Sequence, residues 1–348
     1  MDEKHDEIVM VHRDSLSCEA IVRRLKDGSL FLVCQCGGVK EPAIENRVLV
    51  FRSNDGIKWS EGEPIVPDNG MANYATDVDV DENGVIIVSM TEHSGGYLDT
   101  KGFSLISRDN GNSWERQPLP VFGEKFCFLR NSFRAKNGVK YTAYQFYDIP
   151  KEENDRLSAE GKCVFDTSLQ YVRCGLLFTH DTINYRKSED ILVANEWEGK
   201  RLWQWPEPAP IQLSDGSFSM LLRINGAGRL YRSDSADGAV WSAPYATDIP
   251  NPNNKPKLLT LKDGSIALIN TPNSATGMKY RNPLEIWISD DDMKTWKYKK
   301  RVLDFPGWLS YPDGFAEEDK IMFSFEVNRH DVYFASVDIS DYFRGQKR

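Results

Sequence analysis

The sequence predicts an all-β fold: a six-bladed β-propeller of four-stranded antiparallel blades, closed by an amino-terminal strand. Two observations predict it. A turn of the form Ser-x-Asp-x-Gly ending in an aromatic residue recurs along the chain, and an Asp-Gly or Asn-Gly turn precedes each copy. Repeats with a period near 50 residues indicate arrays of similar supersecondary units. Two turns in each repeat divide it into four strands, which is the make-up of a propeller blade.

The first turn of each repeat is a hairpin signal, because Asp-Gly and Asn-Gly between apolar runs favour tight hairpins. The glycine is present in five copies and absent from the sixth. The copies lie at 25–30, 81–86, 135–139, 213–218, 261–266 and 316–321. Six hairpins predict six blades.

The second turn, which we call the staple turn, joins the last two strands of a blade. Its Asp hydrogen-bonds nearby backbone, its Gly accepts positive φ, and its aromatic residue packs beneath the turn. The copies end at Trp59, Trp114, Tyr185, Trp241 and Trp296, in steps of 55, 71, 56 and 55 residues. We interpret this motif as a folding element and not as a substrate contact.

The sixth blade lacks chain at its carboxyl end. After its hairpin, residues 331–339 alternate like a strand, and no staple turn follows. Residues 7–12 (EIVMVH) are expected to return and complete this blade, which leaves the ring with short, protected edges. No linker interrupts the repeats, so residues 1–348 are predicted to form one domain, with a polar insertion at about 148–170 on the functional face.

Composition excludes several classes of function. A formal charge of −9 without a basic run argues against nucleic acid, and no stretch is long and apolar enough for a membrane span. The segment MDEKHDEIVM has no apolar run, so no signal peptide is expected. The six cysteines lack zinc spacing and are interpreted as free thiols of a reducing, cytoplasmic compartment. No metal or other cofactor is expected.

Function is expected on the face opposite the two turn motifs, where longer loops are held by a rigid scaffold. A ring brings loops from distant parts of the chain to one axial pocket. The candidate residues come from the loops between strands 2 and 3 (Glu41, Arg223, Asn270 and Arg281) and from the blade-to-blade loops (Glu19, Asp77, Glu207, Asn253 and Tyr311).

Together these motifs resemble the sialidase superfamily, whose members carry Asp-box (BNR) repeats of the form S-x-D-x-G-x-T-W. The resemblance runs roughly from Ser17 to Ile339. Its most specific segments are 207–208 (EP), 221–223 (LLR), 250–253 (PNPN), 281–284 (RNPL) and 310–313 (SYPD).

The resemblance implies roles for individual residues. Tyr311 matches the nucleophile, Glu207 its partner, and Asp77 the acid/base. Arg223 and Arg281 match two of three arginines that grip the substrate carboxylate. The first arginine is missing, because Cys18-Glu19-Ala20 occupies its place, so the resemblance implies a sugar pocket without specifying sialic acid.

This chemistry suits the residue types. A tyrosine is mostly neutral at pH 7 and needs a base, which Glu207 supplies. A neutral nucleophile avoids repulsion by an anionic sugar, and sialidases are an exception to the two-carboxylate scheme of glycosidases for this reason. Arg223 and Arg281 are able to hold a carboxylate or sulfate in bidentate fashion. The remaining substrate contacts are expected from Asn253, Glu41, Glu19 and Asn270.

Three hypotheses follow. The leading one is an exo-acting, sialidase-like glycoside hydrolase that removes a terminal sugar from an oligosaccharide. The arginines favour an acidic sugar as this terminal residue. The second is a uronate lyase, in which a base removes the proton alpha to a carboxylate neutralised by arginines. The third is a non-catalytic glycan-binding propeller, which the missing arginine favours.

Overall fold

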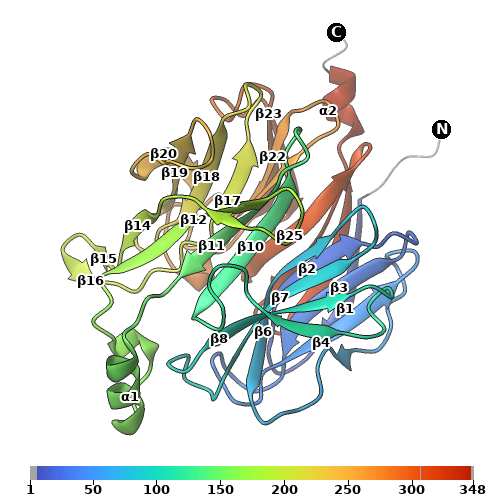
Figure 1. Cartoon of the computed structure of the whole chain (residues 1–348). Coiled ribbons are helices and arrows are strands. Elements are labelled where there is room, and N and C mark those ends of the chain that lie inside the picture. The colour runs from blue at the N-terminus through green and yellow to red at the C-terminus, as the bar shows by residue number, and fades with distance from the viewer. Residues whose placement is uncertain (1–5, 306, 346–348) are drawn as a thin grey trace.

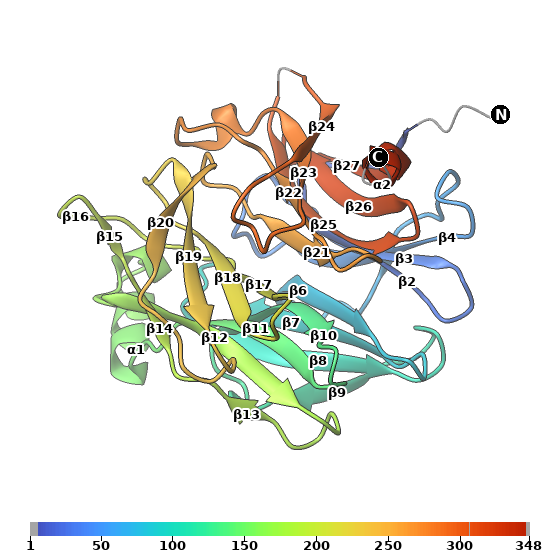
Figure 2. The same cartoon turned by 90° about the horizontal axis from the view of Figure 1, so that it is seen from above.

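The computed structural model describes residues 6–305 and 307–345 and shows six antiparallel blades arranged in a ring (Figures 1 and 2). The predicted fold class, a six-bladed β-propeller, is confirmed. Residues 1–5, which belong to the segment where no signal peptide is expected, lie outside the described residues.

The first three blades follow one another in the amino-terminal half. Blade one consists of β2 (Ser17–Arg24), β3 (Leu30–Cys36), β4 (Arg47–Ser53) and β5 (Glu63–Pro64). Blade two consists of β6 (Ala72–Val80), β7 (Ile86–His93), β8 (Lys101–Ser107) and β9 (Glu115–Pro118). Blade three consists of β10 (Cys127–Arg134), β11 (Lys140–Phe146) and β12 (Tyr171–Thr179), with an outer edge split into β13 (Arg186–Lys187) and β14 (Ile191–Ala194).

The last three blades complete the ring. Blade four consists of β17 (Ala209–Gln212), β18 (Phe218–Arg223), β19 (Arg229–Ser235) and β20 (Tyr245–Pro250). Blade five consists of β21 (Lys257–Thr260), β22 (Ile266–Asn270), β23 (Leu284–Ser289) and β24 (Tyr298–Leu303). Blade six consists of β25 (Leu309–Glu317), β26 (Lys320–Val327), β27 (Asp331–Asp338) and the amino-terminal β1 (Glu7–Arg13).

Closure of the ring follows the prediction. Strand β1 runs antiparallel to β27, with Glu7 opposite Ser336 and Arg13 opposite Asp331. It extends one residue beyond the expected segment. The ends of the described chain therefore lie side by side at blade six, as both views show (Figures 1 and 2). A short helix, α2 (Ser340–Gly345), follows β27.

The staple turns hold each turn together and also join neighbouring blades. In the second copy, Asp109 Oδ1 accepts hydrogen bonds from the backbone of Asn112 and Ser113. Hydrogen bonds from Ser113 are the main reason that the pKa of Asp109 falls to about 2. Trp114 packs tilted against Phe31 of blade one, with ring centroids 6.1 Å apart. The motif thus has the structural role predicted for it.

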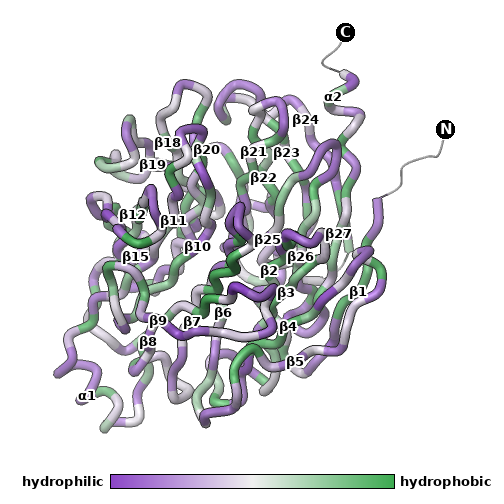
Figure 3. Tube along the Cα trace, turned by 45° about the vertical axis from the view of Figure 1, so that its right-hand side comes forward, coloured by the Kyte–Doolittle hydropathy of each residue, from purple (hydrophilic) through white to green (hydrophobic). Residues whose placement is uncertain are grey.

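The core lies between adjacent blades. One apolar cluster joins blades one and two through buried residues such as Ile21, Phe31, Val78 and Val88, and similar clusters fill the other junctions. Apolar stretches lie within the strands, whereas turns and the projecting helix are mostly hydrophilic (Figure 3). This packing makes the ring a firm support for its loops.

The polar insertion lies between β11 and β12. It contains α1 (Lys151–Ala159) and a 3-10 turn, η1 (Val164–Asp166), and Leu157 anchors the helix in the core. A small hairpin, β15 (Glu196–Trp197) with β16 (Lys200–Arg201), projects nearby. All six cysteines are free thiols. No helix within the described residues has the length and apolarity needed to cross a membrane.

Candidate functional site

Inner strands with an unusual backbone conformation position the candidate site. Left-handed φ values occur within these strands or just before them in five blades, at Glu19 (53°), Asn131 (51°), Glu207 (42°), Asn253 (64°) and Tyr311 (53°). Non-glycine residues rarely adopt this conformation, and strain of this kind clusters at functional sites. In blades one, two, three and six the inner strand also carries a bulge, which re-aims the side chains next to it.

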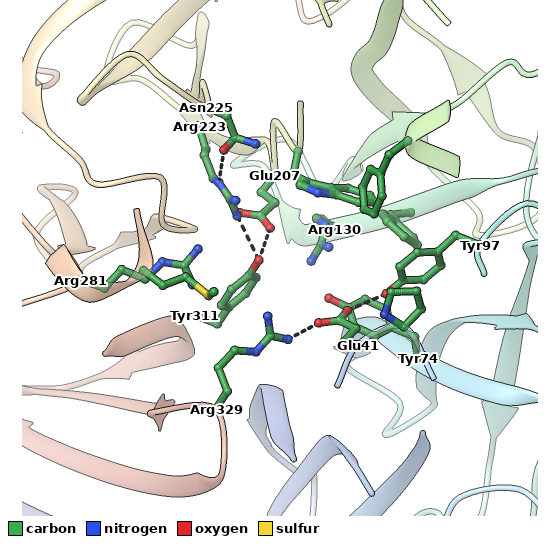
Figure 4. A pocket seen from close by; sticks show the side chains of 15 residues that line it. Glu41, Tyr74, Tyr97, Arg130, Glu207, Arg223, Asn225, Arg281, Tyr311 and Arg329 are labelled. Carbon is green, nitrogen blue, oxygen red and sulfur yellow. Dashed lines mark hydrogen bonds and ion pairs between the residues drawn. The ribbon is translucent and has the colours of Figure 1, made fainter. Parts of the chain in front are cut away.

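These strands surround an axial pocket of about 280 Å³. This volume lies just below the usual range for ligand pockets, about 300–1,000 Å³. Figure 4 shows two unlike halves: arginine side chains around Tyr311 on one side and aromatic rings on the other. The polar lining residues are Glu41, Arg130, Glu207, Arg223, Asn225, Arg281, Tyr311 and Arg329.

Tyr311, Glu207 and Arg223 form a closed hydrogen-bonded group. The Tyr311 hydroxyl donates to Glu207 Oε1 at 2.7 Å, and Arg223 Nη1 donates to Glu207 Oε2 at 2.8 Å. The same nitrogen donates to Tyr311 Oη at 3.0 Å (Figure 4). Residues more than 100 positions apart in the chain thus meet around one phenol.

Burial, together with the negative charge of Glu207, raises the pKa of Tyr311 above its ordinary value of 10. The phenol is therefore neutral at pH 7 and needs a base in order to attack. Burial alone would lower the pKa of Arg223, but Glu207 and Tyr311 beside it outweigh that effect and raise it. Arg223 therefore remains charged and holds Glu207 in position.

Arg281 is buried without a carboxylate partner among the described residues. Its Nη1 donates to Ser310 Oγ at 3.1 Å, its Nη2 donates to the carbonyl oxygen of Asn253 at 2.6 Å, and its Nε has no partner. Burial and the neighbouring Arg223 lower its pKa. A buried guanidinium without a counter-ion favours binding of an anion from solution.

Glu41 lies on the opposite wall and has three partners. Tyr97 Oη donates to Glu41 Oε1 at 2.6 Å, and Arg329 Nη2 forms an ion pair with Glu41 Oε2 (Figure 4). The Cys18 thiol lies 3.8 Å from the same oxygen. Glu41 comes from the loop after β3, and Arg329 comes from the turn between β26 and β27. An acid, a phenol and an arginine from three blades therefore meet here.

Glu19, which was predicted to contact substrate, lies beneath the pocket and is not among the residues that line it. Its carboxylate accepts hydrogen bonds from Tyr74 and Arg130, and from Lys255 Nζ at 3.0 Å. Lys255 also donates to Asp313 at 3.0 Å. This buried network holds Arg130 at the floor of the pocket.

Three other predicted residues are placed differently from expectation. Asp77 does not line the pocket: its Oδ2 accepts the backbone N–H of Ser132 at 3.0 Å, and its Oδ1 lies 3.5 Å from Arg23. Asn270 is buried and bonds Asn251 and the blade backbone. Asn253 acts through its carbonyl, which holds Arg281. The bulge between Ala75 and Asp77 explains why Asp77 does not line the pocket, because it turns this side chain towards Ser132 of blade three.

An aromatic wall faces the arginines, and the motifs did not predict it. Its members include Tyr97, Phe128, Trp205 and Phe165. Phe165 comes from the polar insertion, is 45 % exposed, and packs edge-on against Trp205 with ring centroids 6.2 Å apart. The insertion therefore forms part of the rim, as its position in the sequence had suggested.

The site contains acids, bases and anion-binding groups. No group of three or more His, Cys, Asp and Glu side chains in residues 6–305 and 307–345 is arranged to hold a metal ion. The arrangement is able to hold an anionic ring of about one sugar, place a phenol below it, and present a carboxyl group at Glu41.

Comparison with known proteins agrees with this fold. A model of the BNR repeat-like domain matches residues 179–323. No curated protein sequence matches the chain. A protein of unknown function from Dyadobacter fermentans has 16 % sequence identity and a TM-score of 0.70, with 95 % of this chain and 98 % of that chain covered.

Several of the similar structures are sialidases. The Hadza microbial sialidase Hz136 has 15 % identity and a TM-score of 0.71, with 94 % of this chain and 67 % of that chain covered. Trypanosoma rangeli sialidase, in complex with 2,3-difluorosialic acid as a covalent intermediate, has 13 % identity and a TM-score of 0.65. The matched region covers 99 % of this chain and 60 % of the sialidase chain. These comparisons therefore confirm the propeller fold and the BNR repeats of this chain.

Proposed function

We propose that this sialidase-like propeller is an exo-acting glycoside hydrolase that removes a terminal acidic sugar from an oligosaccharide. The observation that carries the proposal is the group formed by Tyr311, Glu207 and Arg223, with the phenol 2.7 Å from a carboxylate that is able to accept its proton. The small volume of the pocket, about 280 Å³, supports exo action on a single terminal ring.

The first half of the reaction forms a glycosyl–tyrosine bond. Tyr311 Oη attacks the anomeric carbon and passes its proton to Glu207, while the bond from that carbon to the leaving oxygen breaks. Glu41 donates a proton to that oxygen. Glu41 takes this role, in place of Asp77, because its carboxylate lines the pocket.

The second half restores the enzyme. A water molecule gives a proton to Glu41 and attacks the anomeric carbon, the bond to Tyr311 breaks, and Glu207 returns the proton to the phenol. The two displacements together retain the anomeric configuration. Arg281 and Arg223 hold the acidic group of the sugar throughout.

The proposal is tested with 4-methylumbelliferyl glycosides of N-acetylneuraminate and D-glucuronate and with matching acidic oligosaccharides. Tyr311→Phe is expected to lower turnover by roughly 10³-fold or more, because the nucleophile is lost. Tyr298→Phe is the matched control, since its hydroxyl also donates to a carboxylate, Asp341, but at an exposed site. Mass spectrometry after treatment with a 2-fluoro acidic sugar is expected to find the adduct on Tyr311.

Other outcomes lead to the alternative functions. Equal turnover by Tyr311→Phe and the native protein would remove Tyr311 as nucleophile. A product absorbing at about 230–240 nm, as expected of a conjugated uronate formed by proton abstraction, would identify a lyase. Tight glycan binding without turnover would identify a binding propeller.

A further inference from the structure

One of the arginines that line the pocket has no carboxylate within ion-pair distance among the described residues. Arg223 is paired with Glu207, Arg130 with Glu19, and Arg329 with Glu41. Arg281 has no carboxylate partner among the described residues, and both Arg281 and Arg329 keep a buried Nε without a hydrogen-bond partner. One anion from solution is therefore able to satisfy donors that the protein leaves open.

We propose that Arg329 is a further anion-binding arginine supplied by blade six, and that the substrate's acidic group takes it from Glu41. On this proposal, which rests on the proposed function, the Glu41–Arg329 ion pair is exchanged for a pair between Arg329 and the substrate. Glu41 is left without a cation and takes up a proton from solution. Binding of an acidic sugar thereby prepares the acid that the reaction needs.

Geometry supports this exchange. Arg329 extends into the pocket between Tyr311 and Glu41, so its guanidinium borders the space that a bound ring would fill (Figure 4). Its side chain is 22 % exposed, and one ion pair fixes its Nη2. Arg223 is less available, because Glu207, Tyr311 and Asn225 all accept hydrogen bonds from it.

The remaining neighbours of Glu41 are neutral near pH 7, so none of them replaces the arginine. Burial raises the pKa of the Tyr97 phenol and of the Cys18 thiol, and it lowers the pKa of His93 to about 4. Burial likewise raises the pKa of Tyr74. A carboxylate that loses its cation in such surroundings favours its protonated form.

The proton balances over a full cycle. Glu41 takes one proton from solution when the anion binds and gives it to the leaving oxygen when the glycosidic bond breaks. It regains a proton from the attacking water. When the acidic product leaves, Arg329 returns and Glu41 releases that proton to solution.

Isothermal titration calorimetry tests the exchange without turnover. D-Glucuronate and N-acetylneuraminate are titrated at pH 7 in buffers of different ionisation enthalpy, with D-glucose as the uncharged control. Each acidic sugar is expected to bind with uptake of up to one proton. Glu41→Gln, an isosteric amide, is expected to bind without proton uptake.

Two further variants decide which group takes the proton. Glu326→Gln removes another buried acid near Arg281 and Arg329, and the proton uptake should persist in it. Arg329→Met should weaken binding of both acidic sugars by roughly 10- to 100-fold, because a charge-assisted hydrogen bond is lost. Circular dichroism and thermal unfolding check that each variant is folded.

The outcomes separate this proposal from the proposed function. Turnover of acidic glycosides with binding that takes up no proton would overturn the exchange and leave the hydrolase intact. The exchange is equally overturned if uptake persists in Glu41→Gln and disappears in Glu326→Gln. If neither acidic sugar binds, the acidic substrate class falls, and the exchange falls with it.

Discussion

Glu326 is a buried acid whose ionisation should make the stability of the fold depend on pH. Its Oε2 accepts the backbone N–H of Glu19 at 2.8 Å, and its Oε1 has no hydrogen-bond partner among the described residues. Burial raises its pKa from an ordinary 4.5 to about 7, and the attraction of Arg329 and Arg281 only partly offsets this. The folded protein therefore binds this proton more tightly than the unfolded chain does.

The direction and size of the effect follow from linkage. The stabilising contribution is fully present below about pH 4.5 and is lost as the pH rises through about 7. The gap between these two values corresponds to about 3 kcal/mol. Glu326→Gln cannot ionise, so its free energy of unfolding relative to the native protein should rise by about 2 to 3 kcal/mol between pH 5 and pH 8.

Urea unfolding at a series of pH values measures this difference. Glu82→Gln, at an exposed position, is the control and should show no such trend. A difference between Glu326→Gln and the native protein that stays constant from pH 5 to pH 8 would refute the reasoning.

Three further predictions concern the support of the site. Lys255→Met should lower the free energy of unfolding by about 3–5 kcal/mol, because it leaves Glu19 and Asp313 buried without this cation; a loss below 1 kcal/mol in urea unfolding would contradict this. Asp109→Ala removes the staple-turn hydrogen bonds and should lower the Tm modestly while leaving turnover unchanged, and a loss of turnover in the folded variant would show that the motif is more than structural. Gly314→Ala would place a Cβ 2.0 Å from a carbonyl oxygen of the neighbouring strand, so its Tm should fall sharply, and an unchanged Tm would show that the blade yields easily.

The fold was predictable because its signals are local. A turn is specified by a few adjacent residues, so Asp-Gly hairpins and staple turns are readable without knowledge of distant contacts. Their spacing then sets the number of blades. Ring closure by 7–12 followed from the missing strand of the last blade, and the pairing of β1 with β27 agrees.

The candidate site was predictable only in part, because bulges change which way a side chain points. Tyr311, Glu207, Arg223 and Arg281 follow from segments that resemble a known motif, and the structure brings all four to one pocket. Asp77 is, by its residue type, equally suited to the acid/base role predicted for it. A one-residue bulge nevertheless changes the face that later residues present, and the alternation of acids at 77, 79 and 81 carries no sign of it.

Arg329 shows why spacing along the chain misleads in a closed ring. Counting back from the first hairpin finds Cys18 where an arginine is expected, and the sequence then predicts a pocket with one cation fewer. The first and last blades adjoin, however, and β2 packs against β25 and β26. An arginine from the turn after β26 therefore reaches Glu41, the same carboxylate that lies above Cys18. Blade six can thus supply a cation to the part of the pocket that blade one borders. The two blades are far apart in the sequence but adjacent in the ring.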